Sequence, residues 1–356
     1  MPDERTPVPE AKLEQPPAPD RDGGNGGMED VTAATVLEST GGTWRVLTDA
    51  GEQLEVTLRG RLKIYEERRS DYRKLEEDGR HESSEALDRP RKLAVGDRVV
   101  LEPGERGHDW TIGGILPRRS QLARRQPGGR WGERVIVANV DQVVVVFAAA
   151  APEPNERMID RFLVIAEANA LPARLVINKA DLAESSTLVR RFGMYETIGY
   201  PLHLTSVSGG KGLDELRDTL LGRMTALTGP SGVGKSSLIN ALFGVKLRVG
   251  EVSRSVNKGR HTTVGALLTA LPGGGFVADT PGLREVGLWG FPAAELQHEF
   301  PEFRSLLGRC RFADCTHIVE PECAVREAAQ RGEISAARLE SYNTLFAELE
   351  ESERKW

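Results

Sequence analysis

The chain has 356 residues, of which 39% are hydrophobic and 28% are charged, and its formal net charge is −6. This length accommodates two or three domains with ordinary hydrophobic cores. The longest apolar run, residues 143–151, fits a buried strand and is too short to cross a bilayer. The charge excludes a broadly basic protein, so any contact with nucleic acid must be local.

Residues 1–30 form an acidic tail that is rich in proline and glycine. The tail carries eight acidic and three basic residues, a composition that predicts disorder. It has none of the features of a signal peptide, so the protein is expected to be cytoplasmic.

Five short β-like stretches occupy residues 31–117, and glycine-containing turns separate several of them. The stretches are 31–38, 43–48, 53–59, 98–102 and 110–116. Five short strands in such a segment favour a small barrel, and an RNA-binding OB-fold is the natural candidate. A strongly charged segment, residues 66–92, lies between the third and fourth strands and is expected to be a solvated insert.

Residues 118–134 form a basic segment with six arginines, one glutamate and Trp131. Clustered arginine beside an aromatic side chain suits contact with RNA phosphates and stacking on bases. A solvated linker between domains is the alternative interpretation, and the sequence leaves both open.

Residues 135–290 are predicted to be an α/β nucleotide-binding domain, and its first motif reads the base. The motif NKAD (178–181) follows the apolar stretch 174–177. Asp181 can accept hydrogen bonds from guanine N1–H and the 2-amino group, which adenine lacks. Asn178 is expected at the O6/N7 edge, with the Lys179 stem over the base. An SVSGG loop follows, so GTP is the predicted nucleotide. The predicted base-site residues are Asn178, Lys179, Ala180, Asp181, Ser206 and Val207.

Residues 229–236 (GPSGVGKS) match the phosphate-loop pattern G-x-x-x-x-G-K-[ST], with a strand-like segment before them and a helix-like segment after them. The glycines let backbone N–H groups close around phosphate at the positive end of a helix. Lys235 is expected to reach the β- and γ-phosphates, and Ser236 to ligate Mg²⁺. The predicted phosphate-site residues are Gly229, Pro230, Ser231, Gly232, Val233, Gly234, Lys235, Ser236 and Ser237.

The fourth motif, DTPG (279–282), completes the predicted magnesium and γ-phosphate site. Asp279 is expected to hold the Mg²⁺ shell through water, and the Gly282 N–H to contact the γ-phosphate. The polar loop GRHTT (259–263) is expected to be the first switch. Thr263, or Thr262 beside it, then coordinates Mg²⁺ when the γ-phosphate is bound.

Catalysis is predicted to depend on Lys235, Thr263 and His261. Leu283 stands where a Ras-like enzyme has the glutamine that orients water, so intrinsic hydrolysis should be slow. His261 is the candidate for that task, because imidazole accepts a proton near neutral pH. An exposed loop histidine is the alternative interpretation.

The order of the motifs along the chain is unusual. NKAD and SVSGG come first, the phosphate loop follows, and DTPG comes last. An ordinary Ras-like GTPase begins with the phosphate loop and ends with the base-reading motifs. This order predicts a circularly permuted GTPase whose nucleotide-sensing loop leads directly into the following domain.

Residues 291–356 are predicted to be a zinc-binding, mainly helical domain. All three cysteines and one histidine give the pattern C-x4-C-x-H-x5-C, typical of a closed structural zinc site. A disulfide would leave one cysteine unpaired; three unrelated buried cysteines are the other alternative. Residues 335–352 have helical apolar spacing. The predicted zinc ligands are Cys310, Cys315, His317 and Cys323.

Together these motifs resemble the ribosome small subunit-dependent GTPase A family (RsgA, also called YjeQ or YloQ). The resemblance depends on the permuted order, on GRHTT, on the Cys-Cys-His-Cys set, and on ANVDQ (138–142) and IDR (159–161). It implies an N-terminal OB-fold, a permuted GTPase domain and a C-terminal zinc domain.

The resemblance also implies a monomeric checkpoint protein in late maturation of the bacterial 30S subunit. Its members bind the subunit and its 16S rRNA with GTP, hydrolyse GTP when the subunit stimulates them, and then leave. Two other functions remain as alternatives. One is a passive RNA-binding assembly protein that GTP only stabilises; the other is a P-loop enzyme of tRNA modification, for which no further substrate chemistry is visible.

Overall fold

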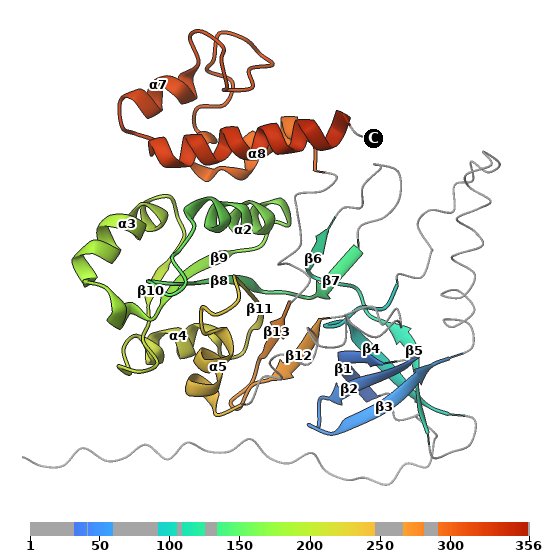
Figure 1. Ribbon diagram of the computed structural model, residues 1–356. Helices are drawn as coiled ribbons and strands as arrows, with labels where there is room; N and C mark the ends of the chain where they lie inside the picture. The colour runs from blue at the N-terminus through green and yellow to red at the C-terminus, as the bar shows by residue number, and fades with distance from the viewer. Residues whose placement is uncertain are drawn as a thin grey trace, which may run out of the picture. The chain divides into compact units, whose positions relative to one another are not determined.

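The computed structural model describes residues 32–40, 42–59, 92–104, 109–124, 134–245, 266–280 and 291–354 (Figure 1). The acidic tail and nearly all of the insert 66–92 lie outside these described residues. His261, Thr263 and Gly282 also lie outside them. Across the described ranges, no helix has both the length and the apolar character needed to span a membrane.

The N-terminal strands close into a five-stranded barrel with the order β1-β2-β3-β5-β4. Residues on its inner side, such as Val36, Val46 and Ile112, are fully buried. The five predicted stretches are confirmed to within two residues, and the closed barrel confirms the OB-like prediction. The strands are β1 (Thr32–Thr40), β2 (Thr43–Thr48), β3 (Gln53–Leu58), β4 (Arg98–Pro103) and β5 (Trp110–Ile115).

A six-stranded sheet with the order β10-β9-β8-β11-β13-β12 forms the centre of the GTPase region. Neighbouring strands are parallel except β12, which runs antiparallel to β13. All residues of β8 are buried, as expected for a strand covered on both faces. The strands are β8 (Gln142–Ala148), β9 (Ala173–Asn178), β10 (Leu202–Leu204), β11 (Met224–Thr228), β12 (Leu267–Ala270) and β13 (Phe276–Asp279).

Helices cover both faces of this sheet (Figure 1). Because side chains alternate along a strand, Val145 and Phe147 of β8 face one layer and Val144 and Val146 face the other. The first layer contains α2 (Glu156–Ala168) and α3 (Ser185–Thr197), and the second contains α4 (Leu213–Leu220) and α5 (Lys235–Phe243).

The barrel is joined to the sheet by a two-stranded hairpin, β6 (Gln121–Arg124) and β7 (Arg134–Ala138). Leu37 and Val95 of the barrel share one hydrophobic cluster with Leu122 of the hairpin and with the sheet. Residues 121–124 and Arg134 of the segment 118–134 are therefore strand residues, and the buried Leu122 shows that β6 is not a solvated linker. Residues 125–133, including Trp131, lie outside the described part of the chain.

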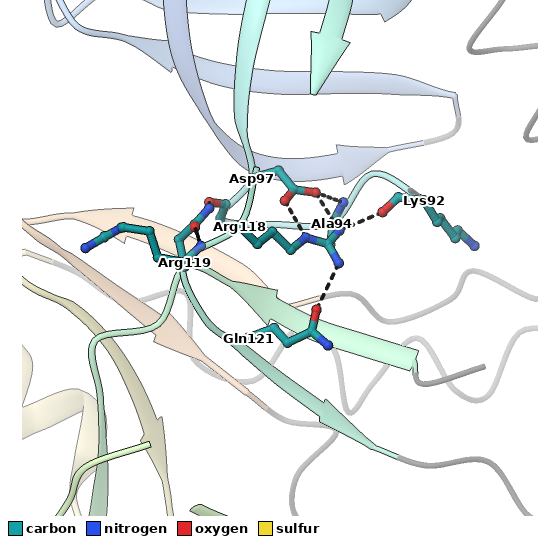
Figure 2. Close-up of polar contacts among 8 residues, drawn as sticks. Lys92, Ala94, Asp97, Arg118, Arg119 and Gln121 are labelled. Atoms are coloured by element: carbon teal, nitrogen blue, oxygen red, sulfur yellow. Dashed lines mark hydrogen bonds and ion pairs between the residues drawn. The ribbon is translucent and has the colours of Figure 1, made fainter. Parts of the chain in front are cut away.

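Arg118 belongs to this joint and is not available to RNA. Its guanidinium donates to the two carboxylate oxygens of Asp97 over 2.7 and 2.8 Å, and to the Lys92 carbonyl over 2.7 Å (Figure 2). The Arg118 side chain is 7% exposed and that of Asp97 is 0% exposed. Within the basic segment, Arg118 therefore has a structural role, because its planar guanidinium matches a buried carboxylate.

The C-terminal region is mainly helical, as predicted. In its core, the ring of Phe300 stacks on that of Phe303, with the ring centroids 5.1 Å apart. Tyr342 of α8 packs edge-on against both rings. Phe346 and Leu349 of α8 are buried in the same cluster, so the apolar side chains spaced along residues 335–352 face the core. The elements are η3 (Ala293–Glu299), η4 (Pro301–Phe303), α7 (Ala324–Gln330) and α8 (Ala336–Arg354).

Candidate nucleotide site and metal centre

The described nucleotide motifs meet at one edge of the sheet. Asn178 ends β9, Ser206 follows β10, Gly229 follows β11 and Asp279 ends β13. These strands run parallel, so their carboxyl ends lie at the same edge, where α/β sheets bind ligands. The structure thus brings together Asn178 and Asp279, which are 101 residues apart in the sequence.

The phosphate loop, residues 229–236, has a path that requires glycine at two positions. Gly229 has φ = 134°, and a Cβ there would lie 2.0 Å from the Val146 carbonyl oxygen. Gly234 has φ = 91°, and a Cβ there would lie 2.6 Å from Nδ2 of Asn178. Both contacts are shorter than any carbon can tolerate, so the loop keeps this path only with glycine.

Lys235 opens helix α5 and turns its side chain back into the phosphate loop. Its Nζ donates to the carbonyl oxygens of Gly229 (2.8 Å) and Pro230 (2.6 Å), and the residue is buried. The ammonium therefore lies inside the loop that is predicted to surround phosphate. Ser236 is half-buried on the first turn of α5, whereas Ser231 and Ser237 are exposed.

The base-reading carboxylate is held by two serines. Asp181 accepts a hydrogen bond from Ser206 Oγ at 2.5 Å and from Ser208 Oγ at 2.9 Å. The Ser206 bond, followed by that of Ser208, lowers the pKa of Asp181. Asp181 therefore stays ionised and acts only as an acceptor, as the two N–H donors of guanine require.

Asn178 has an internal role that the sequence did not predict. It is 2% exposed, and its Nδ2 donates to the Val233 carbonyl over 2.9 Å while its Oδ1 accepts from Thr205 Oγ1 over 3.1 Å. Both ends of the amide are thus bound within the protein, tying the base motif to the phosphate loop. The Nδ2 group carries a second N–H, so the contact of this amide with the O6/N7 edge of guanine stays a prediction. Thr205 was missed, and only its position beside Ser206 could have indicated it.

Lys179 is held directly after β9 by the contacts of its backbone and its ammonium. Its φ is 56°, and its Nζ donates to the carbonyl oxygen of Ala151. The Ala180 N–H donates to the Thr205 carbonyl over 2.9 Å, which ties this motif to the neighbouring loop. Val207 is half-buried and packs against the second hydrophobic layer, and its place in the base site stays a prediction.

The magnesium side of the site is described only in part. Asp279 is half-buried opposite Leu227 in the sheet register, and Thr280 Oγ1 donates to the Leu227 carbonyl over 3.0 Å. The loop that carries Asp279 is thereby tied to the strand that leads into the phosphate loop. The predicted roles of Thr263, Gly282 and His261 stay predictions, because these residues lie outside the described ranges.

The four predicted metal ligands come together in the C-terminal region. The ligand atoms of Cys310, Cys315, His317 and Cys323 lie within 4.8 Å of one another. Tetrahedral zinc with Zn–S bonds of about 2.3 Å requires sulfur atoms about 3.8 Å apart. The Cys310 and Cys323 sulfurs are 3.9 Å apart, and His317 Nδ1 is 3.5 and 3.3 Å from them. The group fits one zinc ion.

A hydrogen bond of His317 and the raised pKa of Cys315 further support a metal ion at this centre. His317 Nε2 lies 2.9 Å from Gln297 Oε1, so it carries the proton and leaves Nδ1 as the ligand atom. Burial raises the pKa of the Cys315 thiol to about 12, so a thiolate there requires a cation. A bound zinc ion would supply that charge.

The sheet, the phosphate loop and the base motif define a P-loop GTPase domain, and the order of the motifs makes it circularly permuted. The RsgA GTPase family model matches residues 115–289. A protein of Gemmatimonas aurantiaca named small ribosomal subunit biogenesis GTPase RsgA is 55% identical over 90% of this chain and 99% of its own length. The protein of that name from Pseudomonas aeruginosa is 44% identical over 73% of this chain and 77% of its own length.

Solved structures agree with this classification. YjeQ from Thermotoga maritima has a TM-score of 0.68 and 34% identity, covering 90% of this chain and 98% of that protein. YloQ, a circularly permuted GTPase, has a TM-score of 0.65 and 25% identity, covering 90% and 96%. The chain belongs to the RsgA family of GTPases, hydrolases that act on GTP.

Proposed function

We propose that this protein is a cytoplasmic, monomeric checkpoint GTPase of small ribosomal subunit maturation. It binds the 30S subunit and its 16S rRNA as the GTP complex, hydrolyses GTP when the subunit stimulates it, and then dissociates. The relatives named small ribosomal subunit biogenesis GTPase support this role. One observation supports GTP as the nucleotide: Ser206 and Ser208 hold the Asp181 carboxylate in place at the edge of the sheet.

Each part of the chain has a task in this proposal. Residues 31–117 bind rRNA, residues 135–290 bind and hydrolyse GTP, and residues 291–356 are organised by one zinc ion. Lys235 stabilises charge on the β- and γ-phosphates. Ser236 and Thr263 would ligate Mg²⁺, which neutralises phosphate charge, and Asp279 would hold its water shell.

The missing glutamine sets the expected catalytic behaviour. Leu283 cannot orient water, so free turnover should be about 10⁻⁴–10⁻³ s⁻¹, the scale of an unassisted Ras-type enzyme. The subunit should raise this rate by fixing the switch loop so that His261 points at the attacking water. His261→Ala should then lose most of the stimulated rate and keep its affinity for GTP, as for a group used only in the transition state.

GTP turnover with and without purified 30S subunits tests the proposal. We expect strong stimulation in the parent protein and none in Lys235→Ala. Equal turnover with and without subunits would favour the passive RNA-binding alternative. Base recognition has a separate test: Asp181→Asn should weaken GTP and favour xanthosine triphosphate, whose C2 carbonyl needs a donor. Unchanged GTP binding by Asp181→Asn would show that the base assignment is wrong.

A further inference from the structure

The segment that follows β8, residues 149–156 (called the loop below; its last residue is the first of α2), is fastened to helix α3 by one side chain. The Arg191 guanidinium binds Glu156 Oε1 through Nε at 2.7 Å and Glu153 Oε1 through Nη1 at 2.6 Å. Its third nitrogen, Nη2, donates to the Pro154 carbonyl over 3.1 Å. All three guanidinium nitrogens bind this one short segment. Because the guanidinium is planar, these bonds restrict both the position and the orientation of the loop.

The other end of this loop lies against the nucleotide site. The Ala151 carbonyl accepts the hydrogen bond from Lys179 Nζ. The next residue, Pro152, runs beside the phosphate loop, because a Cβ at Gly232 would lie 3.7 Å from Pro152 Cδ. The loop therefore joins the base-reading lysine to the edge of the phosphate loop.

Both residues of this hydrogen bond have left-handed backbones. Ala151 has φ = 50° and Lys179 has φ = 56°. Residues other than glycine adopt such angles at a cost in free energy, and they persist where surrounding contacts hold them in place. The contacts of Arg191 hold the loop a few residues beyond Ala151, so they contribute to keeping its carbonyl aimed at the ammonium.

We propose that Arg191 is a positioning residue for guanine-nucleotide binding, which acts through loop 149–156 and Lys179. The loop presents the Ala151 carbonyl, the carbonyl fixes the ammonium, and the fixed ammonium holds the lysine stem in place before the base arrives. Binding then orders fewer side-chain torsions, so the nucleotide is held more tightly. This inference rests on the proposed placement of the Lys179 stem over the base. Because the Lys179 stem contacts the base, which GDP and GTP share, the affinities for GDP and GTP should change equally.

Dissociation rates of fluorescent GDP and GTP analogues test the proposal. Arg191→Ala should release both nucleotides about tenfold faster, the factor that corresponds to one charge-assisted hydrogen bond. With 30S subunits present, KM should rise and kcat should stay unchanged, since Arg191 touches neither phosphate nor water. Arg190→Ala is the matched control: Arg190 is exposed on the same helix and has no ion pair within the described ranges. Wild-type dissociation rates in Arg191→Ala would overturn the proposal.

A coupling experiment separates this inference from the proposed function. In a Lys179→Ala background, Arg191→Ala should add no further loss, because its effect passes through the lysine. An additive effect would overturn the proposal. If Lys179→Ala weakens GTP binding and Arg191→Ala does not, the inference fails and the base site stands. If Lys179→Ala binds GTP normally, the base site itself is wrong. Should Arg191→Ala fail to fold, the variant carrying Glu153→Gln and Glu156→Gln makes the same test from the loop side.

Discussion

The buried ion pairs of Arg338 should dominate the stability of the contact between α2 and the C-terminal region. Arg338, on α8, is 1% exposed and binds Asp160 of α2 at 2.7 Å and Glu302 at 2.7 and 3.2 Å. Tyr195 also donates to Asp160 over 2.8 Å, and the guanidinium lies 4.4 Å from the Phe300 ring centroid. Burial opposes the charge, but the two carboxylates outweigh it and raise the pKa of Arg338.

Arg338→Met keeps much of the side-chain volume and removes the charge. Removing one partner of a buried pair costs about 3–5 kcal/mol, because the other partner is left charged and unpaired. Here two carboxylates lose their partner, so we expect the upper part of that range. Arg157→Met is the matched control, since it breaks the pair with Glu340 across the same two helices. That pair is 57% and 64% exposed, and its loss should cost about 0–1 kcal/mol.

Hydrogen exchange of the α8 amides is the suitable assay. A chain with several domains need not unfold in one step, and exchange measures the local free energy of opening. We expect Arg338→Met to lower this free energy by several kcal/mol relative to Arg157→Met. Equal values for the two variants would refute the reasoning, because the buried pair would then stabilise no more than an exposed one.

Three other expected outcomes concern the phosphate loop, the metal centre and pH. Gly229→Ala should abolish GTP binding in calorimetry, because its Cβ would lie 2.0 Å from the Val146 carbonyl oxygen. Cys315→Ser should release zinc, measured by metal analysis, and speed hydrogen exchange in residues 300–330 while GTP binding survives; structural zinc contributes about 10–16 kcal/mol in small peptides. Burial lowers the pKa of His203 from 6.5, so the unfolded chain binds a proton that the folded protein excludes. The free energy of unfolding should therefore fall as the pH decreases below 6.5. Over the same pH range, the denaturant midpoint of His203→Gln should fall less than that of the parent protein.

Local patterns explain why much of the fold was predictable. Alternating short strands predict the barrel, and a phosphate loop between a strand and a helix predicts the centre of the sheet. The metal ligands were predictable because zinc sites use only a few residue types at short spacing.

Interactions between distant residues explain what the sequence could not show. Arg118 and Arg338 look like solvated charges, and each becomes buried only because a carboxylate elsewhere in the chain meets it. Asp160 and Arg338 are 178 residues apart, and no pattern in either segment indicates the other. The amide of Asn178 matches a base-reading motif, and only the structure shows that it also binds Val233 and Thr205.

The permutation leaves the nucleotide site intact because strand order in space, not order along the chain, assembles the site. β9, β8, β11 and β13 are neighbours in the sheet and parallel, so each loop after a strand reaches the same edge. What the permutation changes is the route of the chain beyond β13. Residues 281–290 lead from Asp279 into a region that the Asp160–Arg338 pair also fastens to α2. The C-terminal region therefore has two links to the GTPase region: the chain itself, which continues from Asp279 at the nucleotide site, and the buried ion pair with α2.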